Sequence, residues 1–274
     1  MRELSFMDAT REALTEEMES DNNIFVVGEG IGKRGGNFNT TSGLYDRFGP
    51  QRLRDTPICE RGFIGMCTGA AMTGSRPIVD FMFVDFMLDS MGELINQAAK
   101  IQYMSSGRLK MPLVLRGTIG IGHASATHHS GSYYAMFVQL PGLHVVVPSN
   151  AYDAKGLFKT AIRRDDPVLF LEHKSLLAST AAVPEHDYAL PFGEAAVVQE
   201  GSDATVVAIA GMVPRTVEAV TQLAAEGIST EVVDPRTLAP LDTTTILESL
   251  HKTGRLLVVD ECAGTCGIAA EVLA

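Results

Sequence analysis

Hydrophobic and polar positions along residues 1–175 follow two alternating patterns. Some stretches carry apolar residues at every third or fourth position, as amphipathic helices do, and others are short and almost wholly apolar, as buried strands are. Helices are predicted at 6–20, 62–74, 88–105 and 153–163, and strands at 23–31, 76–86, 111–117, 143–149 and 167–173. Strands separated by helices pair in parallel and take helices on both faces, so the pattern predicts an α/β fold.

This alternation stops between residues 180 and 203, where prolines and glycines flank short polar turns and no long periodic segment occurs. A new alternation of strand and helix runs from DATVVAIAG at 203–211 to RLLVVDE at 255–261. We therefore predict two domains, residues 1–190 and residues 191–274. The second would hold only a few elements before GIAAEVLA at 267–274, so we expect it to be incomplete, either truncated or finished by a partner.

Composition narrows the class of protein. The 274 residues include 22 Lys and Arg against 33 Asp and Glu, a net charge of −11. Nucleic acids and anionic membranes require clustered Lys and Arg, so this balance argues against both as partners. No apolar run reaches 18 residues and no signal-peptide pattern opens the chain, so we expect no transmembrane helix and a cytoplasmic location. The four cysteines lack the second pair typical of zinc sites, which favours reduced, packed thiols.

A glycine-rich helix is the first candidate for chemistry. Gly62, Gly65 and Gly69 recur at helical spacing and leave one face bare. Each costs roughly 1 kcal/mol against alanine, so the close approach of another backbone or a ligand should offset them. Glu60 stands at the entrance of this helix. It is either an exposed carboxylate favoured by the helix dipole or a partly buried acid that shares a proton with a ligand nitrogen.

The second candidate is the stretch GIGHASATHHSG at 120–131, which carries three histidines. His128 and His129 are adjacent, so on an extended backbone their side chains point to opposite sides and do not easily chelate one ion. His123 lies five residues before His128, and the next carboxylate downstream is Asp153. The spacing therefore disfavours a metal site. One imidazole aimed into a cleft suits general acid–base catalysis, and solvated loop histidines are the alternative.

Several longer stretches, in order and spacing along essentially the whole chain, resemble one known family. They are FGPQRLRDTPICERGFIGMCTGAAMTGSRPI, INQAAKIQYMSSG, PGLHVVVPSNAYDAKGLFKTAIR, EVVDPRTLAPLD and KTGRLLVVDE. The family is the β subunits of the thiamine-diphosphate-dependent first component of pyruvate, branched-chain 2-oxo acid and acetoin dehydrogenase complexes. The resemblance implies an N-terminal pyrimidine-binding domain, with a parallel sheet flanked by helices, and a C-terminal transketolase-like α/β domain.

The same resemblance implies a cofactor shared with a partner. In this family an α subunit supplies the diphosphate and Mg²⁺ site of thiamine diphosphate through a G-D-G motif, which this sequence lacks, and the assembly is an α2β2 heterotetramer. Glu60 matches the glutamate that hydrogen-bonds N1′ of the aminopyrimidine, and Phe86 matches the aromatic residue packed on that ring. His129 matches the histidine of an H-S-Q segment that assists acyl transfer to a lipoyl arm on the acyltransferase second component. Gly131 replaces the glutamine, which puts the hydrogen bonding of this loop and the substrate in question.

The family also has a structural potassium site built largely from backbone carbonyls. By position it maps to Leu113, Ala161, Ile162, Arg164 and Asp166. Relatives often carry Asp where this chain has Arg164, and a cation beside Asp166 could neutralise that carboxylate without any ion. Both a filled potassium site and an internal ion pair are therefore left open.

The resemblance implies an enzyme that is active only with an α subunit. It would oxidatively decarboxylate pyruvate or a branched-chain 2-oxo acid and pass the acyl group to a lipoyl group. The β subunit of an acetoin dehydrogenase is the main alternative. A transketolase-like enzyme acting on sugar phosphates would need extra Arg and His clusters that the sequence lacks, and a non-catalytic scaffold subunit is a further alternative.

Overall fold

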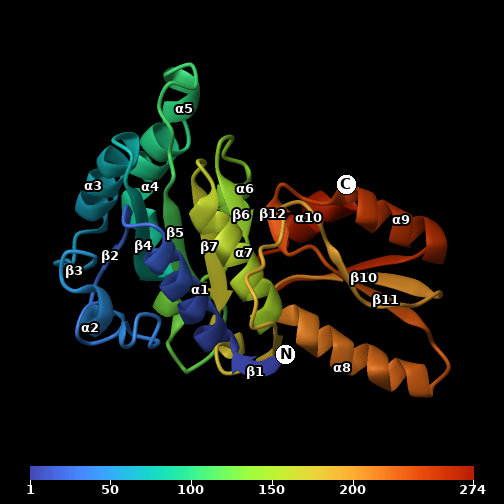
Figure 1. The fold of residues 1–274 in the computed structure, drawn as a ribbon. Helices are drawn as coiled ribbons and strands as arrows, with labels where there is room; N and C mark the ends of the chain where they lie inside the picture. The colour runs from blue at the N-terminus through green and yellow to red at the C-terminus, as the bar shows by residue number, and fades with distance from the viewer.

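A computed structural model describes the whole chain, residues 1–274 (Figure 1). A seven-stranded sheet organises the first two-thirds of the chain. Its order is β12-β6-β7-β5-β4-β2-β3, and every neighbouring pair is parallel except β12 with β6. The strands are β2 (Ile24–Gly28), β3 (Leu53–Asp55), β4 (Arg76–Phe83), β5 (Val114–Ile119), β6 (His144–Val146), β7 (Val168–His173) and β12 (Thr237–Ala239). Strands covered on both faces read as continuous apolar runs, which explains the sequence pattern.

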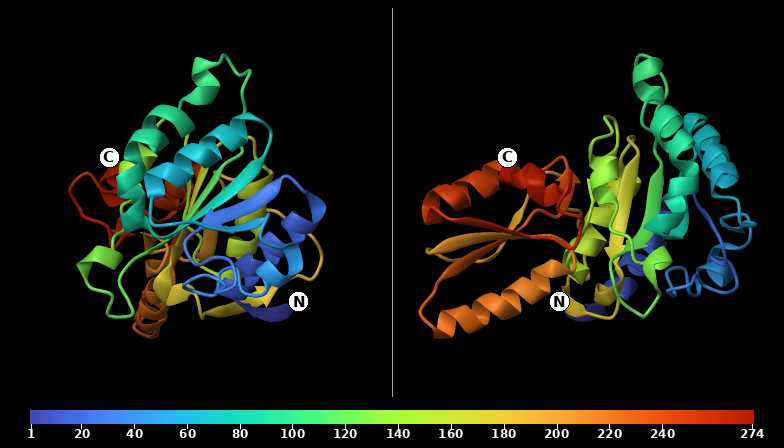
Figure 2. Two further views of the ribbon diagram at one scale, coloured as in Figure 1. Left: turned by 90° about the vertical axis from the view of Figure 1, so that its left-hand side faces the viewer. Right: turned by 180° about the vertical axis from the view of Figure 1, so that it is seen from behind.

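Helices cover both faces of this sheet (Figures 1 and 2). On one face lie α1 (Phe6–Ser20) and α7 (Ala151–Arg163), and on the other α3 (Glu60–Met72) and α6 (Tyr134–Val138). Because successive side chains of a strand point to opposite faces, Val114 packs with α1 and α7 while Leu115 packs with α3 and α6. The expectation of a parallel sheet flanked by helices is confirmed.

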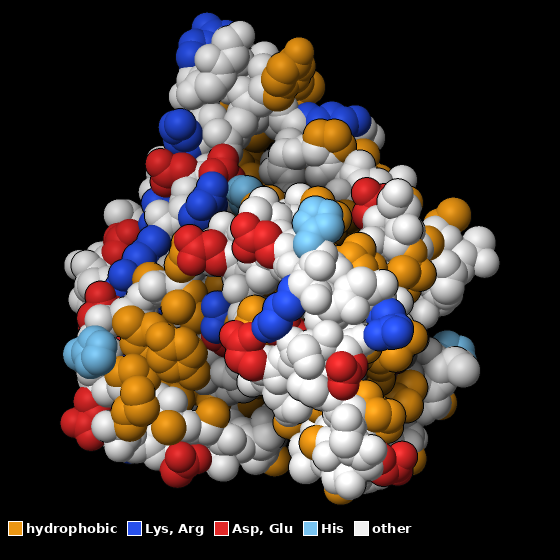
Figure 3. Space-filling model, turned by 90° about the vertical axis from the view of Figure 1, so that its right-hand side faces the viewer, with side chains coloured by type: hydrophobic (Ala, Val, Ile, Leu, Met, Phe, Trp, Pro, Cys, Tyr) orange, Lys and Arg blue, Asp and Glu red, His pale blue; other side chains and the backbone are white.

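The C-terminal part of the chain forms a second, four-stranded sheet of order β13-β10-β11-β9. Its strands are β9 (Ala196–Gln199), β10 (Ala204–Ala208), β11 (Thr230–Asp234) and β13 (Leu256–Val259), and its helices are α8 (Met212–Ala225), α9 (Thr243–Thr253) and α10 (Ile268–Leu273). The right-hand view of Figure 2 shows α8 on one side of this sheet and α9 and α10 on the other. Large apolar side chains such as Val198, Leu247 and Leu257 are exposed here, and Figure 3 shows apolar patches on this side of the molecule.

Three features differ from the sequence prediction. The predicted helix at 88–105 is wrong as a single element, because the chain there forms η1 (Val84–Ser90), α4 (Met91–Glu93), η2 (Leu94–Ala98) and α5 (Ile101–Met104). The start of that stretch contains Ser90 and Gly92, residue types that are poorly suited to helix interiors. Two short strands, β1 (Arg2–Ser5) and β8 (Thr180–Val183), pair antiparallel, and the antiparallel strands β9 and β12 were also not predicted.

Side-chain caps fix where three of the helices begin. Ser5, Asn150 and Asp242 precede α1, α7 and α9, and each side chain accepts a hydrogen bond from a backbone N–H of the first turn. The remaining short elements are α2 (Leu44–Phe48), η3 (Thr127–His129) and η4 (Lys174–Leu176). None of the helices combines the length and the apolar character needed to cross a bilayer.

Candidate active site

The histidine stretch and the end of β4 meet in an aromatic cluster. The short helix η3 places the His129 ring on Phe83, with ring centroids 4.5 Å apart and planes 26° apart. Phe86 of η1 packs edge-on against both, at 5.4 Å from His129 and 5.5 Å from Phe83. Phe38 adds a further edge contact to Phe83 at 5.5 Å. Of the predicted site residues, Phe86 and His129 therefore lie in direct contact.

One ring nitrogen of the His129 imidazole forms no hydrogen bond within the chain. This nitrogen is Nδ1, and it is buried. Buried polar atoms are almost always paired, so a partner for Nδ1 has to come from a bound molecule or from another chain. The neighbouring His128 is exposed, as expected for a surface residue. The two adjacent histidines therefore have different environments, and of the two only His129 has a buried ring nitrogen without a partner.

A buried lysine, Lys174, binds the backbone of His129. The Lys174 ammonium donates to the His129 backbone carbonyl and lies 5.4 Å from the centre of the Phe83 ring. Burial lowers the pKa of Lys174, and the carboxylates of Asp85 and Glu261 act in the opposite direction. No pattern in the sequence points to a function for this residue, because a lysine just after a strand is ordinarily a solvated turn residue.

The stretch that holds the histidines has a strained backbone. His123, Ala124 and Ala126 all adopt positive φ, at 58°, 51° and 56°. Non-glycine residues in this region cost of order 1–3 kcal/mol each and persist only where the surroundings fix them. Below the strained residues, Gly120 N–H donates to the Gly131 carbonyl at 3.0 Å and closes the loop at its base.

The structure explains why position 131 has no side chain. A Cβ on Gly131 would lie 2.2 Å from the Tyr133 ring and 2.8 Å from Oδ1 of Asp85. A glutamine in this conformation would need Tyr133 to move. The departure at residue 131 is therefore accommodated by Tyr133, whose ring lies where the added side chain would begin.

Glu60 begins α3 and is half-buried. It lies outside the aromatic cluster, and the next residue, Arg61, links the start of α3 to η1 through the Asp89 carbonyl at 3.4 Å. A second carboxylate is close by: burial, with the like charge of Glu60 added, raises the pKa of Glu29. Glu29 was missed, because the glycine spacing around it matches no phosphate-binding motif. Burial and a like charge both favour the neutral form of Glu29, and a neutral carboxyl group can donate a hydrogen bond to a ligand nitrogen.

The bare face of α3 does not pack inside the chain. A Cβ on Gly69 would meet nothing within 4 Å, and one on Gly65 would only just reach Glu93. Nearby apolar side chains are also open to solvent, with Ile58 at 82% and Met66 at 47% of full exposure. The close approach predicted from the glycines is therefore not made within this chain.

Three of the backbone carbonyls proposed for potassium already have partners inside the chain. Arg76 donates to the carbonyls of Ile162 at 3.1 Å and Arg164 at 2.5 Å, and Val168 donates to that of Leu113 at 2.9 Å. Arg164 also pairs with Asp166 at 3.2 Å. The Arg76 guanidinium thus supplies a positive charge here, and the potassium site on Leu113, Ala161, Ile162, Arg164 and Asp166 stays a prediction.

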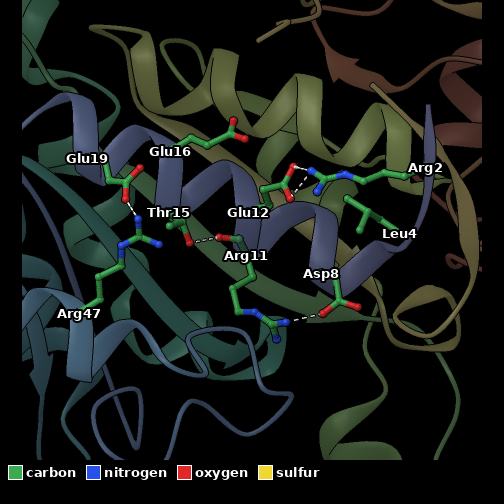
Figure 4. Close-up of a pocket in the computed structure, with 9 residues that line it drawn as sticks. All are labelled: Arg2, Leu4, Asp8, Arg11, Glu12, Thr15, Glu16, Glu19 and Arg47. Carbon is green, nitrogen blue, oxygen red and sulfur yellow. Dashed lines mark hydrogen bonds and ion pairs between the residues drawn. The ribbon is translucent and has the colours of Figure 1, made fainter. Parts of the chain in front are cut away.

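Two surface grooves, each of about 480 Å³, differ in character. The groove beside α1 is lined almost wholly by charged residues that pair with one another, such as Arg2 with Glu12 and Arg11 with Asp8 (Figure 4). The other is more apolar and includes Phe38 and His123, whose rings are 6.3 Å apart. Because Phe38 contacts Phe83, this second groove reaches the aromatic cluster.

No group of three or more His, Cys, Asp or Glu side chains is arranged to hold a metal ion. All four cysteines are free thiols, but the prediction that they are packed holds only for Cys67, since Cys59 and Cys266 are exposed and Cys262 is half-buried. Burial raises the pKa of Cys67 to about 12, which makes it an unreactive core residue.

Comparisons with known proteins fit these two α/β units. Residues 2–180 match the transketolase pyrimidine-binding domain, and residues 193–274 match the transketolase C-terminal domain. The structure is also similar to a split-gene transketolase described as an inactive β4 tetramer, with a TM-score of 0.80 and 25% identity over 98% of this chain and 85% of that one. The fold and the site thus define a transketolase-like protein.

Similar sequences narrow the class further. The chain is 45% identical to the β subunit of acetoin:2,6-dichlorophenolindophenol oxidoreductase of Cupriavidus necator, over 100% of this chain and 83% of that one. It is 44% identical to the 2-oxoisovalerate dehydrogenase β subunit of Bacillus subtilis (100% and 84%) and 43% identical to the pyruvate dehydrogenase E1 β subunit of Rickettsia felis (98% and 83%). The chain belongs to the β subunits of the first component of 2-oxo acid dehydrogenase complexes.

Proposed function

We propose that this chain, with an α subunit, catalyses the oxidative decarboxylation of pyruvate or a branched-chain 2-oxo acid and transfers the acyl group to a lipoyl group. The observation that carries the proposal is its full-length similarity, at 43–45% identity, to β subunits of such enzymes. Residues 1–190 would form the pyrimidine-binding domain and residues 191–274 the C-terminal domain. We place the complex in the cytoplasm.

Glu60 at the start of α3 and Glu29 just after β2 suit the pyrimidine end of thiamine diphosphate. When bound, this cofactor supplies an electron sink for the carbon–carbon bond that is cleaved. Glu60 would hold a proton at the pyrimidine ring nitrogen. Glu29, whose pKa is raised by burial and by Glu60, would be a second acid nearby. Phe86 would pack against the ring. Mg²⁺ would be held by the α subunit.

His129 would act on the acyl group as it leaves for a lipoyl arm on the second component. Its buried, unpartnered Nδ1 is consistent with a proton-transfer role, because the chain leaves that atom for another molecule. The groove that includes Phe38 and His123 offers an approach to the same cluster.

The exposed, bare face of α3 supports the need for a partner. Gly62 and Gly69 are exposed there, beside Ile58 and Met66, so another backbone can approach closely. We propose that this face docks in an α2β2 heterotetramer. Replacing Gly69 with leucine should weaken co-purification of the α subunit while leaving the fold of this chain intact, since the added side chain points into open space.

Steady-state assays of the αβ complex with pyruvate, 2-oxoisovalerate and acetoin test the reaction and the substrate. A preference for acetoin would show that the chain is the β subunit of an acetoin dehydrogenase. The 45% identity to an acetoin oxidoreductase β subunit also supports this alternative. Glu60→Gln should lower decarboxylation about 10²-fold or more, as expected when a general acid–base group is lost. The exposed Glu185→Gln serves as the control.

The role of His129 has its own matched pair. His129→Ala should reduce lipoyl acylation about 10²-fold while decarboxylation, followed with an artificial electron acceptor, continues. The adjacent and exposed His128→Ala should leave both steps near the original rate. Equal effects of the two substitutions would remove His129 from the acyl-transfer step.

A further inference from the structure

A carboxylate from the C-terminal sheet reaches the histidine loop. Glu261 follows β13, and its Oε1 accepts hydrogen bonds from Ile121 N–H at 3.0 Å and from the Ser132 hydroxyl at 3.0 Å. Ile121 directly follows Gly120 and Ser132 directly follows Gly131, the two residues whose hydrogen bond closes the base of the loop. One oxygen atom of Glu261 therefore joins both ends of the strained segment that carries His129.

A buried histidine lies beside this carboxylate. Nε2 of His173, a side chain only 2% exposed at the end of β7, lies 3.1 Å from the same Glu261 oxygen. Ser175 N–H donates to Nδ1 of His173 at 3.2 Å, which leaves the proton of the neutral imidazole on the nitrogen facing Glu261. Although burial alone would raise it, the contacts with His173, Ser132 and Ile121 hold the pKa of Glu261 below its ordinary value.

Two glycines make room for this pair. A Cβ on Gly120 would lie 2.0 Å from His173 and 2.6 Å from Glu261, and one on Gly211 would lie 2.7 Å from His173. Gly211 precedes α8 in the C-terminal part of the chain, so both sheets leave space for the same imidazole. The contact between the two sheets at this point is close and polar.

We propose that Glu261 is a positioning residue that, through the role proposed above for His129, makes acyl transfer depend on how the C-terminal sheet docks. The Glu261 carboxylate holds the histidine loop in its strained conformation through Ile121 and Ser132, and the buried His173 lies beside the carboxylate. Without Glu261 the His129 imidazole would still be present, but the loop that carries it would no longer be held in one conformation. Decarboxylation, which we assign to Glu60 on a different element, would be spared.

Hydrogen exchange of the assembled αβ complex tests this directly. In Glu261→Ala, amides of residues 120–132 should exchange about tenfold faster or more, because two hydrogen bonds to a charged group are lost. Glu261→Gln keeps an acceptor oxygen for Ile121 and Ser132, so its exchange should fall between that of the alanine variant and that of the original protein. Glu248→Ala, an exposed change in the same domain, is the matched control and should alter nothing.

The activity readout separates positioning from general loss of structure. Glu261→Ala should lower lipoyl acylation about tenfold and keep decarboxylation with an artificial acceptor within about twofold of the original rate, with glutamine restoring part of the acylation. Unchanged exchange at 120–132 would overturn the proposal, as would an equal fall in both half-reactions. Faster loop exchange with full acylation would overturn the link to catalysis. His129→Ala tests its own role separately and without disturbing the Glu261 contacts.

Discussion

A buried ion pair between β5 and β7 allows a quantitative test of what holds the central sheet together. Arg116 donates to Glu172 through Nε at 2.5 Å and Nη2 at 2.8 Å, and the two side chains are only 2% and 1% exposed. Although burial opposes its charge, the Glu172 carboxylate raises the pKa of Arg116. Arg116→Met would leave a carboxylate buried without its partner, a change that costs about 3–5 kcal/mol.

That cost translates into a measurable shift in melting temperature. A chain of this size loses about 2 °C per kcal/mol, so Arg116→Met should melt about 6–10 °C lower in a thermal scan followed by circular dichroism. The double variant Arg116→Met with Glu172→Leu should recover more than half of the loss, because well-packed apolar pairs replace buried ion pairs at little cost. A single variant within about 2 °C of the original, or a double variant as unstable as the single one, would refute this reasoning.

Two further changes probe the interior. Burial raises the pKa of Asp234 from 3.8 to about 7, so the folded chain holds a proton that the unfolded chain releases, and stability falls as pH rises between these values. Asp234→Asn should remove that pH dependence. Measured by urea denaturation, the free energy of unfolding of the variant relative to that of the original protein should rise by about 1.4 kcal/mol per pH unit between pH 4 and 7. A difference between the two proteins that stays constant with pH would contradict this. Gly28→Ala should destabilise by about 1–3 kcal/mol, because its Cβ would lie 2.4 Å from the Asp80 carbonyl, whereas Gly69→Ala should not destabilise the chain in the same titration.

The sequence predicts the central strands well because their environment leaves a strong signal. Strands such as β5 and β7 are covered on both faces and contain almost only apolar residues. Strands β1, β8, β9 and β12 are three or four residues long and lie at sheet edges or in a two-stranded sheet. Their pairing is decided by tertiary contacts, which periodicity does not encode.

The site was only partly foreseeable for a similar reason. Phe86 and His129 were identified through family motifs, and the structure brings them into contact. Lys174 and Glu261 carry charges directly after strands, where the local pattern indicates solvated turns. Only the packing of two sheets against the histidine loop reveals that both are close to it.

Strand β12 has a consequence for dividing this protein into parts. It follows β11 of the C-terminal sheet in the chain, yet it completes the larger sheet by pairing with β6 through Thr237 and Ala239. Cutting the chain near residue 190 would remove that strand and leave β6 paired on one side only, with β7. An open strand edge recruits other chains, so the isolated N-terminal half should self-associate through β6. The larger sheet is therefore complete only when the C-terminal part of the chain is attached.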